Sequence, residues 1–107
     1  MEYESLESKI GYSFDNKKLL RESLTHTTYV NEHREEDLQD NQRLEFLGDA
    51  IINAVITTRL FTELAEEREG ILTKKRVELI NETALSSIAR YLSLGEHLLL
   101  GRGEEMD

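Results

Sequence analysis

The sequence predicts an all-α fold, and three observations carry this prediction. The chain of 107 residues has no proline and only six glycines, so few residues interrupt helices. Apolar residues recur at helical spacing along most of its length. Hydrophobic residues make up 38% and charged residues 33%, which is typical of a folded globular protein. We therefore expect one compact helical domain.

The beginning of the chain predicts two short helices. Leu6 and Ile10 form the apolar side of the first helix, which should stop near Gly11. Asp15 or Asn16 can cap the second helix. Its buried stripe consists of Leu19, Leu20 and Leu24.

The middle of the chain predicts one long helix after a polar loop. Residues 25–29 should end the second helix, and residues 31–40, with five acids, should form an exposed loop. A long helix is then expected from about Gln42 to Leu64. Its two apolar stripes predict burial on more than one side, which would make it the core helix. The stripes are Leu44, Leu47, Ile51 and Val55, and Ile52, Ile56 and Leu60.

Two more helices are expected in the second half of the chain. The polar run at residues 66–70 should break the long helix, with Gly70 at the break. The next helix should cover about residues 71–80. Asn81 is positioned to cap a last helix, which carries apolar residues from 85 to 92.

The composition excludes several classes of protein. There is no cysteine, so disulfides and thiolate metal sites are absent. No stretch approaches the roughly 20 apolar residues of a membrane-spanning helix. The acidic N-terminus lacks the apolar core of a signal peptide. We expect a cytoplasmic protein without a membrane partner or a small-molecule cofactor.

The net charge of −9 argues against a general nucleic-acid binder, because a basic surface normally attracts phosphate. An acidic nuclease still fits this charge if its acids hold metal and its cations follow the nucleic acid. The only tight basic cluster is Lys74, Lys75 and Arg76, and the solvated face of a helix explains it equally well.

Residues 41–50 carry the strongest functional signal. Glu45 and Asp49 are four residues apart in a helix-forming run, so both carboxylates lie on one helix face. Their repulsion calls for a compensating cation, and carboxylate oxygens suit Mg²⁺ or Mn²⁺. Gly48 exposes the backbone beside the pair, which indicates close approach by another chain, a substrate or a metal. A charged stripe on a buried helix is the simpler alternative.

This stretch, N-Q-R-L-E-F-L-G-D-A, closely resembles the signature of the ribonuclease III family, N-E-R-L-E-F-L-G-D. Gln42 departs from it, where the family usually has glutamate. Further segments resemble family motifs in the same order, so that the resemblance covers nearly all of the chain. They are L-T-H at 24–26, E-G-I-L-T at 69–73, an arginine and two apolar residues at 76, 79 and 80, and G-R-G-E-E at 101–105.

The resemblance implies a homodimeric endoribonuclease that hydrolyses double-stranded RNA with Mg²⁺ or Mn²⁺, leaving 5′-phosphate and 3′-hydroxyl ends. It assigns metal binding and catalysis to Glu45 and Asp49. Gln42 and Glu69 would line the RNA cleft, and Phe46 would insert into the partner subunit. Because glutamine carries no charge, we expect a weakened cleft with an intact metal pair.

The family also has a second acidic pair beyond the G-E-E segment, and often a double-stranded-RNA-binding domain. Neither is present here, so residues 1–107 are expected to be the N-terminal part of a ribonuclease III endonuclease domain, and to be inactive alone if the second pair is essential.

Two other functions remain open. A non-catalytic module for RNA binding or dimerisation would explain Gln42 and the net charge, but gives no reason to keep Glu45 beside Asp49. A generic acidic helical bundle would require accidental motif matches. His26 is not expected to act as an acid or base, because a histidine at a helix end is more often structural, and His33 and His97 lack the spacing of ligands.

Overall fold

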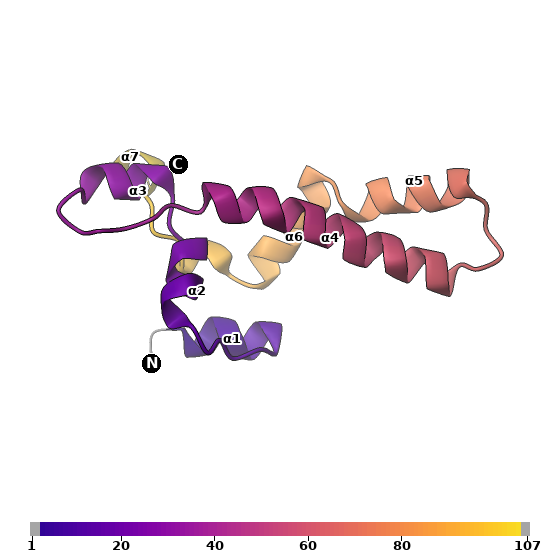
Figure 1. Ribbon diagram of the computed structural model, residues 1–107, viewed down its shortest axis with the longest axis horizontal. Coiled ribbons are helices and arrows are strands. Elements are labelled where there is room, and N and C mark those ends of the chain that lie inside the picture. Colours follow the sequence, from indigo (N-terminus) through magenta and orange to yellow (C-terminus); the bar gives the residue numbers. More distant parts are fainter. Residues whose placement is uncertain (1–2, 106–107) are drawn as a thin grey trace.

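The computed structural model describes residues 3–105, and helices dominate this part of the chain (Figure 1). Within it there is no β-strand, only a single parallel bridge between Thr25 and Leu99. The predicted all-α class is therefore confirmed. The elements are α1 (Glu4–Ile10), α2 (Lys17–Ser23), α3 (Thr27–Glu32), α4 (Gln42–Glu63), α5 (Glu69–Leu79), α6 (Glu82–Tyr91), the 3₁₀ turn η1 (Leu94–Glu96) and α7 (Arg102–Glu105).

The predicted helix ends are confirmed where a side chain or a glycine sets them. Gly11 follows α1 with φ of 71°, a left-handed conformation that glycine adopts at little cost. Asn16, not Asp15, caps α2 by accepting a hydrogen bond from the Leu19 amide at 3.0 Å. Asn81 caps α6 in the same way.

Two boundaries differ from the prediction. Residues 27–32 form the separate helix α3, whereas residues 25–29 were expected to end the preceding helix. Its cap is the imidazole of His26, and imidazole is not among the usual capping groups. Gly70 lies in the first turn of α5, not at a break. The conformational cost of glycine applies chiefly to a helix interior, so glycine is tolerated in a first turn.

The buried core of the described residues lies in what we call the head, residues 3–41 together with residues 92–105. It contains Leu6, Leu20 and Leu24, each less than a tenth exposed. Four partly buried side chains pack against these leucines: Tyr3, Phe14, Leu92 and Leu94. The two ends of the chain therefore share one core.

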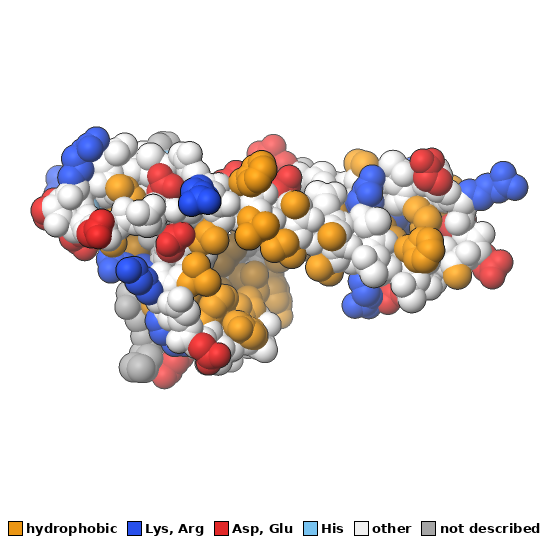
Figure 2. Space-filling view, viewed as in Figure 1, with side chains coloured by type: hydrophobic (Ala, Val, Ile, Leu, Met, Phe, Trp, Pro, Cys, Tyr) orange, Lys and Arg blue, Asp and Glu red, His pale blue; other side chains and the backbone are white. Residues whose placement is uncertain are grey.

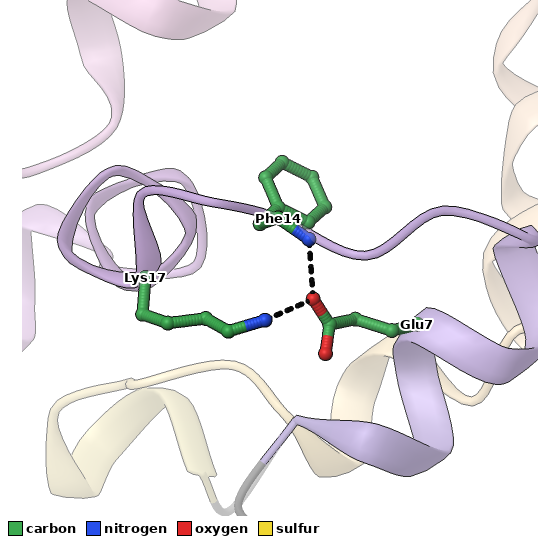
Figure 3. Close-up of polar contacts among 3 residues, drawn as sticks. All are labelled: Glu7, Phe14 and Lys17. Carbon is green, nitrogen blue, oxygen red and sulfur yellow. Dashed lines mark hydrogen bonds and ion pairs between the residues drawn. The ribbon is translucent and has the colours of Figure 1, made fainter.

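A polar contact joins α1 to α2 within the head (Figure 3). The Glu7 carboxylate accepts hydrogen bonds from the Phe14 amide, at 2.6 Å, and from Lys17 Nζ. These two donors, with Lys17 the larger influence, hold the pKa of Glu7 below its ordinary value of 4.5. The contact fixes the turn between the two helices.

The helices α4 and α5 lie side by side and form what we call the arm, which projects from the head (Figure 1). None of the described side chains in α4, α5 or α6 is buried. The prediction that α4 is buried on more than one side is wrong for the isolated chain, since Phe46 is 83% and Val55 is 54% exposed. An apolar pattern specifies a face to be covered, but not the chain that covers it.

The molecule is consequently elongated, with extents of 55 × 27 × 22 Å. Its radius of gyration is 16.6 Å, whereas a compact domain of this length would have about 13 Å. Hydrophobic side chains gather along α4 and in the hollow beside it (Figure 2). None of the helices within residues 3–105 is long and apolar enough to span a membrane.

Candidate active site

The acidic helix α4 starts at a point fixed by the junction between α2 and α3. The amide of Asn41 donates to the Thr25 carbonyl at 2.9 Å, and its side-chain amide donates to the Ser23 carbonyl at 3.0 Å. Thr25 itself is 1% exposed, and its hydroxyl donates to the Arg21 carbonyl. The first turn of α4 is therefore held against the best-buried part of the head.

Gln42 belongs to a small polar cluster at the same place. Its side-chain Nε2 donates to Thr27 Oγ1 at 2.7 Å, and the Thr27 hydroxyl in turn donates to Asp40 at 3.0 Å. The other oxygen of Asp40 accepts the Gln42 backbone amide at 3.1 Å. A glutamate at position 42 has no N–H to donate, so it would compete with Asp40 for the single Thr27 proton. Compared with a glutamate, Gln42 therefore lacks a negative charge but gains a hydrogen bond to Thr27.

Most of the predicted site residues line one surface depression of about 610 Å³. Four of the five lie there: Gln42, Glu45, Phe46 and Asp49, joined by His26, Thr27, Asn41 and Ala50. The side chains of Glu45 and Asp49 are exposed, and neither carboxylate has an ion pair or hydrogen bond within residues 3–105. Two unpaired carboxylates on successive turns of a helix offer hard oxygen ligands, so they fit a divalent cation.

Two carboxylates fill only part of a coordination sphere. Within the described part of the chain, no third histidine, aspartate or glutamate joins them in a group able to hold a metal. A Mg²⁺ ion prefers about six oxygens. The remaining positions are therefore left to water, to phosphate oxygens or to residues outside the described part.

Glu69 does not join this group within one chain. It lies in the first turn of α5 and lines a separate pocket of about 140 Å³ between α4 and α5. Arg76 lines the same pocket and donates to Thr57 Oγ1 at 3.1 Å, which links the two helices of the arm. The assignment of Glu69 to an RNA cleft stays a prediction about an assembly of chains.

The basic cluster at residues 74–76 does not form one cationic surface. Arg76 is turned toward α4, whereas Lys75 faces Glu78 of its own helix at 3.9 Å. Lys74 and Lys75 are exposed. This arrangement agrees with a solvated helix face, which was one of the two open interpretations.

Sequence reasoning did not find the part played by Thr27 and Asp40. A hydroxyl and a carboxylate separated by a polar loop produce no periodic pattern. The chain end was also missed: the Gly101 amide donates to Thr28 Oγ1 at 2.8 Å, and the Arg102 amide donates to Glu32 Oε2 at 2.9 Å. Figure 1 shows α7 beside α3 for this reason. The L-T-H and G-R-G-E-E segments, both noted as motifs, were the available signals.

Comparison with known proteins decides the family, because the sequence pattern of the family described as Ribonuclease-III-like matches residues 16–107. This chain belongs to the ribonuclease-III-like family. The curated relatives of this ribonuclease-III-like chain include Ribonuclease 3 from Myxococcus xanthus, 50% identical over 101 residues that cover 94% of this chain and 39% of the relative. Ribonuclease 3 from Geobacillus thermodenitrificans is 46% identical, covering 97% of this chain and 42% of the relative. The ribonuclease-III-like chain thus spans about two fifths of these relatives.

A solved structure gives the same result for the fold of this ribonuclease-III-like chain. The nuclease domain of ribonuclease III from Campylobacter jejuni superimposes with a TM-score of 0.84 at 39% identity, covering 96% of this chain and 68% of that one. That structure is described as flexible in a region involved in dimer formation. The helical order found here is therefore the order of a known nuclease domain.

Proposed function

We propose that this chain is part of an endoribonuclease that hydrolyses double-stranded RNA with Mg²⁺, or alternatively Mn²⁺, leaving 5′-phosphate and 3′-hydroxyl ends. The observation that carries the proposal is the unpaired pair Glu45 and Asp49, which lines one depression in a ribonuclease-III-like chain. The name Ribonuclease 3, which the curated relatives share, supports the reaction class.

Glu45 and Asp49 are the residues that would hold the metal. When bound, the ion supplies positive charge for the scissile phosphate and lowers the pKa of a water molecule. The two carboxylates orient the site from successive turns of α4, and Asp49 is assigned as the nearer to the attacking water. Residues 1–107 would supply this acidic pair of the endonuclease domain, with further ligands from outside them.

A homodimer is the proposed assembly, and Phe46 is its proposed contact. Phe46 is 83% exposed although it neighbours the acidic pair in the same depression. An aromatic side chain so placed is a typical anchor for a partner's pocket. Glu69 lines a separate pocket within one chain, and we propose that it reaches the RNA cleft only in the assembled dimer. The proposed location is the cytoplasm, where RNA substrates are found.

Incubation of the purified chain with long double-stranded RNA and Mg²⁺ tests the reaction, with EDTA and Asp49→Asn as controls. Discrete cleavage that disappears in both controls is the expected result if Glu45 and Asp49 suffice. Cleavage that persists in Asp49→Asn would contradict the assigned site. If cleavage appears only after the chain is extended by the segment that follows in its Ribonuclease 3 relatives, the site draws ligands from that segment.

A non-catalytic module for RNA binding or dimerisation is the second candidate. The hydrogen bond from Gln42 to Thr27 favours this module, because a neutral residue stands at the rim of the site where the family usually has an acid. Thermal unfolding separates the two functions. Mg²⁺ or Mn²⁺ at about 100 times its dissociation constant should stabilise the chain by about 2.7 kcal/mol, and Asp49→Asn should abolish this gain. A metal-insensitive melting temperature would favour the non-catalytic module.

A further inference from the structure

The imidazole of His26 is held in one tautomer by neighbouring groups. Its Nδ1 accepts the Thr28 backbone amide at 3.1 Å and lies 2.7 Å from Thr28 Oγ1. The Thr28 amide can only donate, so Nδ1 carries a lone pair, and the Thr28 hydroxyl, which accepts the Gly101 amide at 2.8 Å, donates its own proton to that nitrogen. Since Nδ1 is an acceptor from both donors, the neutral ring carries its proton on Nε2.

The remaining ring nitrogen is available to a ligand. Within residues 3–105, Nε2 has no hydrogen-bond partner, and no buried side-chain nitrogen or oxygen is left unpaired, so Nε2 is accessible to solvent. His26 lines the same depression as Glu45 and Asp49. The site therefore combines two acceptors that attract a cation with one oriented N–H donor.

We propose that His26 is an RNA-binding residue of this site, and that its Nε2–H donates a hydrogen bond to a phosphate oxygen of the RNA backbone. The inference rests on the proposed function. A protonated Nε2 has no lone pair for a metal, and Nδ1 is already occupied, so His26 is not a third metal ligand.

Thr28 and Gly101 are positioning residues for this donor. A chain of hydrogen bonds runs from the Gly101 amide through the Thr28 hydroxyl to Nδ1, so the ring is set by a residue that lies 73 positions beyond Thr28 in the sequence. A side chain at position 101 would meet Thr28 Cβ at 2.7 Å and would also contact the Glu32 carboxylate. The end of the chain thus fixes the direction of the Nε2–H bond.

The test measures binding of a short RNA duplex at fixed salt, with Ca²⁺ in place of Mg²⁺. His26→Asn keeps an acceptor for the Thr28 amide but loses the distal donor, and we expect about 10- to 100-fold weaker binding. His26→Gln, whose side-chain amide reaches the position of Nε2, should retain most of the affinity. His33→Asn is the matched control and should bind normally, because His33 does not line the depression. Its imidazole instead contacts the Tyr29 carbonyl and stacks on the Tyr29 ring.

Two results would overturn the inference alone: RNA binding by His26→Asn equal to that of the unsubstituted chain, or loss of the metal-dependent melting shift in His26→Asn, which would make His26 a metal ligand. No RNA binding by the unsubstituted chain would overturn the proposed function together with this inference. Nitrogen-15 NMR of the side chain gives an independent reading. We expect the Nε2–H tautomer in the free chain, and an Nδ1–H tautomer would contradict the assigned donor.

Discussion

The head and the arm are built on opposite principles. In the head, three buried leucines and a set of hydrogen bonds join segments from both ends of the chain. In the arm, α4 and α5 contact each other but bury no side chain, and large apolar residues face outward. The depression that holds Glu45 and Asp49 lies where the two regions meet. One wall of the site therefore belongs to the well-packed head. The other wall is α4, which carries exposed apolar side chains.

The largest expected difference between the regions is in the cost of removing a leucine. Leu20 is 3% exposed in the head and Leu47 is 55% exposed on the arm. Leu20→Ala should lower the free energy of unfolding by about 2–5 kcal/mol because it leaves a cavity. Leu47→Ala should cost about 0.5 kcal/mol or less at concentrations where the chain is monomeric. Urea unfolding followed by circular dichroism gives both values, and equal losses would mean that the arm is covered in solution.

The second test concerns what covers the arm. Phe46→Asp places a charge in the proposed contact and should raise the dimer dissociation constant by about 30-fold or more, as loss of an interface anchor does. Phe61→Asp is the matched change at another exposed aromatic, 73% exposed and on the separate pocket between α4 and α5. Analytical ultracentrifugation over a concentration series measures both constants. A similar change of the dissociation constant in the two variants would contradict the assignment of Phe46 as the specific dimer contact.

The third test loosens residues 101–105 from α3 within the head. Gly101→Ala should destabilise the chain by about 1–3 kcal/mol, because the added Cβ would overlap Thr28 and Glu32. A Cβ at Gly103 meets no atom within 4 Å, so Gly103→Ala is the control and should be close to neutral. Hydrogen exchange should show the loss in α3 but not in α5. Exchange that rises equally in both helices would mean that the two regions are not independent.

The smallest effect concerns Glu7, whose pKa is lowered by Lys17 first and by the Phe14 amide second. The pKa of Glu7 is lower in the folded state than in the unfolded state. The stabilisation of the fold by this contact is therefore complete above about pH 4.5 and is lost as the pH falls through the folded pKa. Glu7→Gln should lower the urea midpoint near neutral pH and remove this part of the acid sensitivity. Glu35→Gln, on the exposed loop, is the control. An unchanged acid profile in Glu7→Gln would contradict the linkage.

The parts of this fold that the sequence could predict are those governed by local chemistry. The long helix α4, the asparagine caps and the left-handed Gly11 all follow from periodicity or from a single residue type. The short helix α3 did not follow, because six residues with an imidazole cap show no apolar period. The exposure of α4 could not be predicted either. A pattern of leucines and isoleucines is the same whether the same chain or another molecule covers it.

The same distinction between local sequence and distant contacts applies to the candidate site. Glu45 and Asp49 were predicted together because four residues on a helix fix their relation whatever surrounds them. The contribution of Thr27, Asp40 and the chain end depends on contacts between segments far apart in sequence, which no local pattern specifies. Glu69 could be noted by its motif, but no pattern in the sequence showed that it lines a pocket apart from the acidic pair.

The pairing of Thr25 with Leu99 also has a consequence for biosynthesis. Residues 99–102 are synthesised after helices α1 to α6, so the backbone groups at the junction of α2 and α3 wait for these partners while those helices are made. The contacts between α4 and α5 are closer in sequence and can form earlier. The acidic helix should therefore be in place before the histidine beside it receives its final orientation.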